Sequence, residues 1–382
     1  MAVFSFVGSI HPMKNDNNGF AIQKYDSGWM NERLKFIVSC GSNSHIVEIN
    51  AGKWQDDSKN VVYTMSRSNG SNKSEKIQID WNKRHDKKSI DKVAGWRIMT
   101  VDMDTYQNRK KANDSGNKED IEKSEKRLHN FIAGTDFCEY VNKILGNDKI
   151  KDMKFRVNGN VNYTYSAKDD RYYSNYEVNK IYRVENDTET SSNISLDFYF
   201  EKGKLDDSDF EETGKALIDG YTTFYSNEAK KNCFCPVTIV FRGEQKQLAG
   251  WKKKVFDNFE NTEEVRKVDL ICSCINGSDE VEITYDMLDD DTKENIDFGL
   301  TTLDDVIKSM RNDKVKGDRI QEIRIVKLGK NSAQNGSEET DYTAELLHEK
   351  PNNNIDNDDE NDDDDLTVDD DDDDDYFDDE DL

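Results

Sequence analysis

Six basic and seven aromatic residues fall between positions 154 and 183, a stretch of thirty residues that holds only three acids. The bases are Lys154, Arg156, Lys168, Arg171, Lys180 and Arg183, and the aromatics are Phe155, Tyr163, Tyr165, Tyr172, Tyr173, Tyr176 and Tyr182. Unpaired nucleobases stack on aromatic rings for ~1–3 kcal/mol each, while Lys and Arg pair with the phosphates. Rings beside cations on a β surface therefore indicate chemistry suited to a single-stranded nucleic acid.

Alternation along the strands divides these side chains between two faces. If Phe155, Val157 and Val161 face a core, Tyr163 and Tyr165 share that face. The turn SAKDDRYYSN then presents rings beside bases. We expect the following residues to contact nucleic acid: Arg156, Lys168, Arg171, Tyr172, Tyr173, Tyr176, Lys180 and Arg183. The competing interpretation is that the tyrosines fill a β core, although Tyr clustered with bases is a costly way to fill one.

A second basic stretch covers residues 63–89, with seven bases, three acids, Tyr63 and Trp81. It combines a Ser/Asn/Gly-rich hairpin tip with the basic turn WNKRHDKK. We expect five of its residues to extend the contact, namely Arg67, Lys73, Trp81, Lys83 and Arg84. A third stretch, 109–127, mixes bases with acids and reads either as a mobile loop or as an ordinary solvated face.

Enzyme motifs are absent from the sequence. There is no G-x-x-x-x-G-K-[ST], no G-x-G-x-x-G between a strand and a helix, no G-x-S-x-G and no H-E-x-x-H. The five histidines stand alone, which favours structural or solvent-facing roles. A catalytic site made of acids that are scattered in the sequence and meet only in the folded chain stays open. We expect a protein that is not an enzyme and that has no cofactor.

Four of the six cysteines form two C-x-C pairs, Cys233 with Cys235 and Cys272 with Cys274. Four thiolates can hold a tetrahedral zinc. Both pairs lie in apolar, strand-like runs, however, and free Cys is among the most buried residue types. We expect core thiols and no metal. Six cysteines in 382 residues make no disulfide framework, which fits a reducing cytoplasm. No signal peptide or membrane-spanning segment is expected.

Two segments share the pattern F-x-[FV]-x-G-x-[IV]: residues 4–10 and residues 155–161. Apolar residues at alternate positions mark a half-buried strand, and a Gly on the buried face marks a bend or bulge. Small five-stranded barrels need a strongly coiled first strand. The repeat therefore predicts two five-stranded barrels in tandem. The expected fold class is mainly β: tandem OB-like five-stranded barrels, followed by a small α+β C-terminal unit and a disordered acidic tail.

Short β-branched and aromatic runs follow each of these starts, and two segments, 131–145 and 244–259, have helical spacing. The predicted division is a first barrel with basic loops (1–130), a connecting helix (131–150), a second barrel (151–259), an α+β unit (260–330), and a linker and acidic tail (331–382). Within the α+β unit we expect strands at 268–275, 280–284 and 319–328, and helices near 286–297 and 302–312. Thr302 and Asp305 form a plausible capping pair for the second helix.

The chain ends on DDDDDYFDDEDL. From residue 351 onward it holds 19 acids and no Lys or Arg, so the first 350 residues carry 61 acids against 53 bases. Such a segment is too charged to fold alone. A solubilising tail is one interpretation. The other is that the carboxylates with Tyr376 and Phe377 imitate a phosphate chain with stacked bases, and so compete for the protein's own cationic groove until a ligand frees the tail for a partner.

The segment KFRVNGNVNYTYSAKDDRYYSNYEVNKIYRV, the run ISLDFYF and the acidic tail resemble the single-stranded-DNA-binding proteins of tailed bacteriophages. That resemblance implies an OB-fold body and sequence-tolerant binding during DNA replication, recombination or repair, in the cytoplasm of an infected bacterial host. It also implies tail contacts with a phage DNA polymerase, helicase or recombination protein. The tail residues concerned are Tyr376, Phe377, Asp378, Asp379, Glu380 and Asp381. Here five residues follow Phe377, whereas several such tails end on the aromatic.

Two other classes of protein stay open. One is a phage virion or assembly scaffold protein with no nucleic-acid binding. The other is an acidic chaperone that binds basic proteins through its tail. Binding of oligo-dT separates both from the first interpretation.

Overall fold

The computed structural model describes residues 2–14, 17–68, 74–226, 229–259, 264–282, 285, 288–303, 306 and 314–351, with the side chains of 278–282 and 314–319 left out. Three predictions lie outside these residues: Lys73, the Thr302–Asp305 cap with the helix near 302–312, and the tail from residue 352 with its six predicted contact residues. Among the described residues, no helix is both long and apolar enough to cross a membrane.

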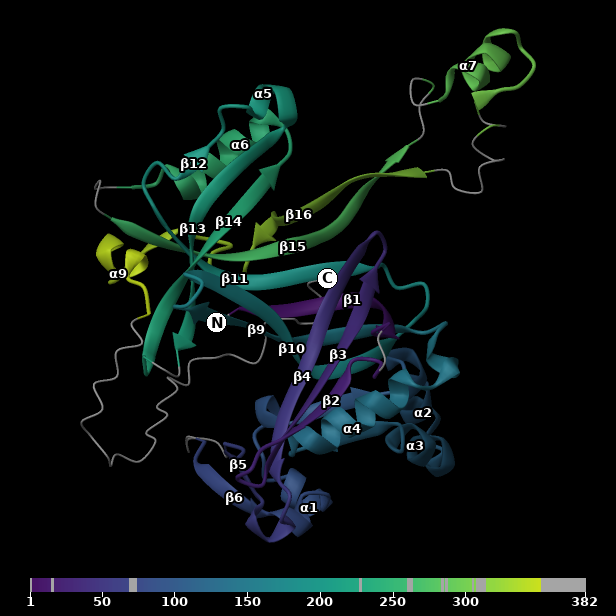
Figure 1. The fold of residues 1–382 in the computed structure, drawn as a ribbon, viewed down its shortest axis with the longest axis vertical. Helices are drawn as coiled ribbons and strands as arrows, with labels where there is room; N and C mark the ends of the chain where they lie inside the picture. Colours follow the sequence, from purple (N-terminus) through teal and green to yellow (C-terminus); the bar gives the residue numbers. More distant parts are fainter. Residues whose placement is uncertain are drawn as a thin grey trace.

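The described part of the chain is mainly β, as expected. Fifteen strands join in one sheet, while β5 (Val61–Met65) and β6 (Lys76–Asp80) form a separate hairpin. Within the large sheet, two sets of five strands each return by pairing to the strand from which they start. Figure 1 shows β3 and β4 of one set and β13 and β14 of the other in different parts of the molecule. Each set is called a ring below.

The first ring contains β1 (Val3–Pro12), β3 (Trp29–Cys40), β4 (Asn43–Trp54), β9 (Lys154–Ser166) and β10 (Arg171–Val184). Pairing runs β1–β3–β4–β10–β9 and back to β1. All contacts are antiparallel except β4–β10, which is parallel. Strand β2 (Phe20–Lys24) adds to the edge of β3.

The second ring contains β11 (Ser191–Glu201), β13 (Lys215–Ser226), β14 (Lys231–Arg242), β15 (Val265–Glu282) and β16 (Lys314–Leu328). Pairing runs β11–β13–β14–β16–β15 and back to β11. In the first ring the parallel pair, β4 and β10, is the third and fifth strand in chain order. In the second ring the third and fifth strands, β14 and β16, are likewise the parallel pair. The two rings therefore have the same connectivity, and they join through β1–β11 and β4–β15.

A helix stands between the third and fourth strand of each ring. In the first ring this is α4 (Gly134–Leu145), whose residues Phe137, Cys138, Val141 and Leu145 are buried because they recur at helical spacing. In the second ring it is α6 (Gln245–Trp251), which continues as a π-helical turn (Lys252–Phe256). Both helices match the helical segments predicted from the sequence. A single apolar cluster, which includes Phe4, Phe36 and Phe198, extends through both rings.

An insertion between β4 and α4 supplies the rest of the first half. After the β5–β6 hairpin come α1 (Lys87–Ile90), β7 (Met99–Asp102), α2 (Tyr106–Ser115), α3 (Lys118–Glu125) and β8 (Leu128–Phe131). The stretch 109–127 is therefore a pair of helices rather than a loop. Gly116 ends α2 at φ 63°, and the Asn117 side chain caps the start of α3.

The two Phe/Gly segments lie side by side in one ring, as the antiparallel pair β1 and β9. Residues of β9 are buried on alternate positions, as expected, whereas residues 4–8 of β1 are all buried, so both faces of β1 are covered there. Phe4 lies opposite Gly159, and Gly8 lies opposite Phe155. The repeated pattern therefore reflects the mutual fit of two neighbouring strands, each of which has Gly where its partner has Phe.

The strand pairings also differ from the sequence-based division at 131–150, 151–259 and 260–330. Strands β9 and β10 belong with β1, β3 and β4 because β9 pairs with β1 and β10 pairs with β4. Strands β15 and β16, expected in a separate α+β unit, complete the second ring. The small helix α7 (Asp290–Asp297) follows β15.

The expected linker does not begin at residue 331. Residues 329–351 pack on the second ring through β17 (Glu338–Glu339), which pairs with β15, and α9 (Ala344–His348). Leu347 is buried against Tyr199, Phe234 and Val265. The remaining short elements are β12 (Leu205–Asp206) and α5 (Phe210–Thr213).

Candidate nucleic-acid interface

A polar hollow of about 460 Å³ opens on the outer face of the first ring. It lies between β3, β4 and the turn end of the β9–β10 hairpin. Its lining residues are Arg33, Lys35, Ile46, Val47, Glu48, Thr164, Tyr173, Ser174 and Asn175.

Strand alternation places the two cations of the hollow on the outer face. Leu34 and Phe36 are fully buried, so Arg33 and Lys35 point to the other side of β3. The parallel pairing of β4 with β10 covers only Tyr176 with Val47 and Glu177 with Glu48. The hollow lies beside this short pairing.

Glu48 organises the cations. Its carboxylate accepts hydrogen bonds from Arg33 Nε at 2.9 Å and from Asn175 Nδ2, and it lies 3.9 Å from Lys35 Nζ. Its side chain is 7% exposed, whereas those of Arg33 and Lys35 are 47% and 41% exposed. Glu48 uses only part of the five N–H donors of a guanidinium. Two cations against one carboxylate leave the hollow with a positive balance.

Apolar groups complete the hollow. Tyr173 is 51% exposed and Ile46 is 52% exposed. The Tyr173 hydroxyl donates to Asp169 Oδ2 at 3.2 Å, which holds the ring at the edge of the turn. The hollow thus combines an exposed ring with two cations, the pair of groups that stacks a base and neutralises a phosphate.

The β9–β10 turn adjoins the hollow through Asp169, which accepts the hydrogen bond from Tyr173. Lys168 of the turn and Arg171 at the start of β10 are exposed. Asp170 accepts a hydrogen bond from Tyr165 at 2.6 Å and pairs with Lys350 Nζ at 2.6 Å. Lys350 is the last basic residue of the chain. The last described residues are therefore attached to the β9–β10 turn.

Two of the predicted tyrosines pack inside. Tyr176 contacts Phe4, Phe6 and His45, and its hydroxyl lies 3.5 Å from Cys274 Sγ. Burial raises its pKa well above the usual value. The Tyr176 ring thus belongs to the core and offers no stacking surface.

Tyr172 is half-buried, with its ring 5.0 Å from Tyr165 and 6.2 Å from Phe224 of β13. Burial raises its pKa to about 12. It joins the two hairpin ends β9–β10 and β13–β14. Of the adjacent pair Tyr172 and Tyr173, only the side chain of Tyr173 is presented to the hollow.

The strand cations predicted with these tyrosines lie elsewhere. Arg156, Lys180 and Arg183 are half-buried at the end of the β9–β10 hairpin remote from its turn. A register shift between Val178 and Lys180 interrupts the pairing with β9. Because such a bulge reverses the side-chain parity, Lys180 leaves the inward face that Tyr176 and Val178 share.

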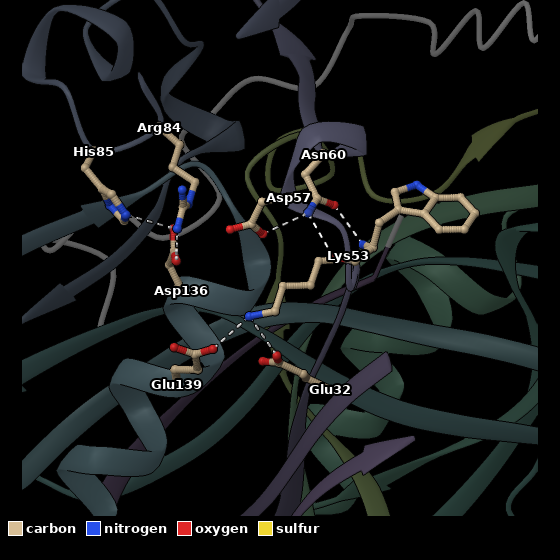
Figure 2. A network of polar contacts seen from close by, with 9 residues as sticks. Glu32, Lys53, Asp57, Asn60, Arg84, His85, Asp136 and Glu139 are labelled. Atoms are coloured by element: carbon tan, nitrogen blue, oxygen red, sulfur yellow. Dashed lines mark hydrogen bonds and ion pairs between the residues drawn. The ribbon is translucent and has the colours of Figure 1, made fainter. Parts of the chain in front are cut away.

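Two predicted residues of the second stretch, Trp81 and Arg84, are engaged in internal contacts, and Figure 2 shows the contact of Arg84 with Asp136. Arg84 pairs with Asp136 of α4 at 2.7 Å, and its guanidinium lies 4.0 Å from the centre of the Trp81 ring. Trp81 packs against the apolar cluster under the β5–β6 hairpin. Lys83 pairs with Asp80, and Arg67 is exposed.

A neighbouring network in Figure 2 holds strands β3 and β4 to α4. Lys53 Nζ lies 3.1 Å from the buried carboxylate of Glu32 and 2.9 Å from Glu139 of α4. Burial raises the pKa of Glu32, and the Lys53 ammonium opposes that rise. These contacts are structural ties between β3, β4 and α4.

The second ring has a comparable carboxylate at its own parallel pair. Glu322 of β16 lies 2.8 Å from Arg324 Nε and 3.4 Å from Arg242 Nε of β14, and it also pairs with Lys215 of β13. Burial raises the pKa of Glu322, but hydrogen bonds from these three cations outweigh it and bring the pKa to about 2.

The cysteines are buried and free. Cys233 and Cys235 pack with Phe224, whereas Cys272 and Cys274 lie in the main core. Burial raises the pKa of Cys235 to about 12 and that of Cys274 to about 11, so both stay protonated thiols. Within the described ranges, no three His, Cys, Asp or Glu side chains cluster as a metal site would require.

Sequence reasoning missed Arg33, Lys35, Ile46 and Asn175. The signal for the first two was present: in RLKFIV the apolar residues alternate with Arg and Lys, which predicts a cationic outer face for that strand. Ile46 and Asn175 carry no such signal, because only strand pairing brings them to the same hollow.

No family model matches the chain, and no curated protein matches it. Two solved structures of the single-stranded DNA binding protein from Thermus aquaticus are similar to it at 9% identity. The wild-type structure has a TM-score of 0.29 and covers 72% of this chain and 85% of that chain. A deletion mutant has a TM-score of 0.26, with 72% and 87% covered. Scores this low carry no argument, so the proposal below depends on the geometry.

Proposed function

We propose that the protein binds single-stranded DNA without strong sequence preference, through the hollow on the outer face of the first ring. The observation that carries the proposal is the conjunction of Arg33, Lys35 and the exposed ring of Tyr173 around one opening. Lys168 and Arg171 of the turn extend the positive surface. A base stacks on Tyr173 while the adjoining phosphates pair with the cations.

Each ring is proposed to be an OB-like barrel. The identical connectivity of the two rings, with a parallel third and fifth strand and a helix before the fourth strand, supports this interpretation. On this basis the first barrel covers residues 3–184 with its insertion at 55–133, and the second covers residues 191–328. The tandem arrangement is retained, but with boundaries that follow the pairing.

The acidic tail is proposed to compete for the same hollow. Support comes from the Lys350–Asp170 ion pair, which holds the last described residues at the β9–β10 turn, close in sequence to Tyr173 of the hollow. The sequence that follows carries 19 acids, and a competitor tethered to the same chain acts at a high effective concentration. When DNA occupies the hollow, the tail is released for protein partners such as a polymerase, helicase or recombination protein.

The biological setting follows the sequence resemblance to phage proteins. It places the protein in DNA replication, recombination or repair in the cytoplasm of an infected bacterium, as a binding protein rather than an enzyme. We leave Trp81 and Arg84 out of the interface because their side chains hold the insertion to α4. Tyr176 is left out because it lies in the core.

A fluorescence titration with oligo-dT tests the proposal. We expect binding at low salt that weakens as salt rises, because bound counterions are released. The paired substitution Arg33→Gln with Lys35→Gln removes two cations and is expected to flatten the slope of log K against log salt by about 1.4, at roughly 0.7 per phosphate contact on single strands. Absence of binding at low salt by both the full chain and a chain ending at residue 351 would favour a scaffold protein. Binding of a basic protein but not of oligo-dT would favour a chaperone.

A further inference from the structure

The molecule has two ends of opposite character, separated along its longest axis. Figure 1 shows β15 and β16 running away from the second ring, with α7 at their far end, while β5, β6 and α1 lie at the opposite end. We call residues 288–303 together with Val306 the tip. We call residues 57–68 and 74–98 the basic end.

The tip is a small folded unit that exposes apolar side chains. Leu288 and Val306 are buried against Ile296 and Leu303, so it has a core of its own. Directly after α7, Phe298 is 72% exposed and Leu300 is 75% exposed.

The end of α7 explains why the exposure of Leu300 is unusual. Gly299 has φ +73°, its N–H donates to Ile296 O, and the N–H of Leu300 donates to Asn295 O, which is the Schellman pattern. An apolar residue at the position of Leu300 commonly packs back on its helix in this motif. Here it faces solvent, so the tip leaves both Phe298 and Leu300 uncovered.

The basic end exposes a ring of its own. Tyr63 on the outer face of β5 is 73% exposed, and Val61 beside it on that face is 37% exposed. Leu300, Tyr63 and Phe298 are the three most exposed large apolar side chains of the described chain. Phe298 and Leu300 lie on the tip and Tyr63 lies on the basic end, so these side chains are at opposite ends of the molecule.

The charges of the two ends are complementary. The tip holds five acids and one base, namely Asp289, Asp290, Asp291, Glu294 and Asp297 with Lys293. The described residues of the basic end hold nine bases against five acids, with Lys87, Lys88 and Lys92 among the exposed bases.

We propose that the tip of one copy of this chain docks on the basic end of a second copy. The contact joins two different surfaces, and because these lie at opposite ends of the molecule (Figure 1) it produces an open row of copies joined head to tail. Phe298 and Leu300 supply the apolar centre of the contact against Tyr63 and Val61, and the surrounding charges set its orientation and its sensitivity to salt. This inference concerns the protein alone and does not depend on the DNA-binding proposal.

The test is sedimentation velocity on the full chain at low salt, over a range of concentrations and without DNA. We expect the mean mass to grow with concentration beyond that of a dimer. Two variants remove one surface each: Phe298→Ser with Leu300→Ser, and Tyr63→Ser with Lys87→Glu and Lys88→Glu. Each is expected to weaken self-association at least tenfold. All the changed side chains are exposed, and urea unfolding confirms that each variant folds like the parent.

Mixing the two variants gives the decisive result. Each retains the surface that the other lacks, so the mixture is expected to form a 1:1 complex that cannot grow. A parent chain that stays monomeric at all concentrations overturns the proposal. Self-association unchanged by the tip substitutions, or two monomeric variants that form no complex when mixed, overturns it as well.

Discussion

Phe4 of β1 lies directly opposite Gly159 of β9, and the glycine makes room for the ring. A Cβ at position 159 would lie 2.7 Å from Phe4 Cε1 and 1.9 Å from the carbonyl oxygen of Glu177. No flexible side-chain end can yield to relieve these contacts, because one is with backbone and the other is with a buried ring. The strands of the first ring can approach as they do only because position 159 has no side chain.

Gly159→Ala is therefore expected to destabilise the first ring by about 1–3 kcal/mol, since overpacking forces neighbouring groups to shift. The measurement is the urea midpoint of unfolding. Gly250→Ala in α6 is the matched control, because nothing lies within 4 Å of its Cβ position and Ala is the better helix former. Equal stability of the two variants would show that β1 and β9 do not pair in this register.

The sequence predicted much of the local structure. Alternation identified the buried face of β9 correctly, whereas Ser5 and Val7 of β1 are buried as well as its Phe residues. The helical spacing at 131–145 identified α4. Which strands pair could not be predicted, because β9 and β10 join strands more than a hundred residues earlier in the chain. The shared pattern of the two Phe/Gly segments suggested two barrel starts, whereas the structure makes them neighbours.

The candidate site could be predicted only in part, because local patterns are present in the sequence whereas long-range packing is not. Tyr173 was predicted from its turn, and the adjacent Tyr172 could not be distinguished from it without knowing that Phe224 packs against it. Uninterrupted alternation would put Tyr176 and Lys180 on one face, but the bulge after Val178 separates them. A bulge has no signature in this sequence, so parity counted through it gives the wrong face.

Tyr173→Ala is expected to raise the Kd for oligo-dT roughly tenfold, because one stacking surface is lost, while Tyr173→Phe retains it. Fluorescence titration at fixed low salt measures the change. Neither substitution is expected to alter the urea midpoint, because this ring is half exposed. An unchanged Kd for Tyr173→Ala would remove the ring from the interface.

Tyr172→Ala is expected to behave in the opposite way. Its ring contacts Tyr165 and Phe224, so its loss is expected to lower the urea midpoint. The Kd for oligo-dT, measured on the folded protein, is expected to change little. Tyr172→Phe serves as the control, since it keeps the ring packing.

Glu322→Gln is expected to make stability depend less on pH. The pKa of Glu322 in the folded chain, about 2, is below the reference value of 4.5. Its contribution to the free energy of unfolding is therefore complete above about pH 4.5 and is lost as the pH falls toward 2. We expect the substitution to cost about 1–2 kcal/mol at pH 7, after allowance for solvent screening, and progressively less below pH 4.

Urea unfolding at pH 7, 5 and 3 measures this difference. Glu211→Gln on the exposed surface of α5 is the control. A cost that stays constant across the three pH values would mean that the carboxylate does not hold Lys215, Arg242 and Arg324 in the folded chain.

Removal of the residues after 351 is expected to tighten oligo-dT binding at low salt by about tenfold, because a tethered competitor is lost. The gain is expected to shrink as salt rises and screens the carboxylates. Titrations of the full and shortened chains at several salt concentrations measure it. Equal affinities at low salt would mean that the tail does not reach the hollow.

The location of the bound strand tests the central claim most directly. Ultraviolet cross-linking of the full chain to oligo-dT, followed by mass spectrometry of the peptides, identifies the residues in contact with bases. We predict cross-links at Tyr173 and in the peptides that contain Arg33, Lys35 and Ile46. Cross-links confined to other parts of the chain, with none in these peptides, would contradict the assignment of the hollow as the DNA-binding site.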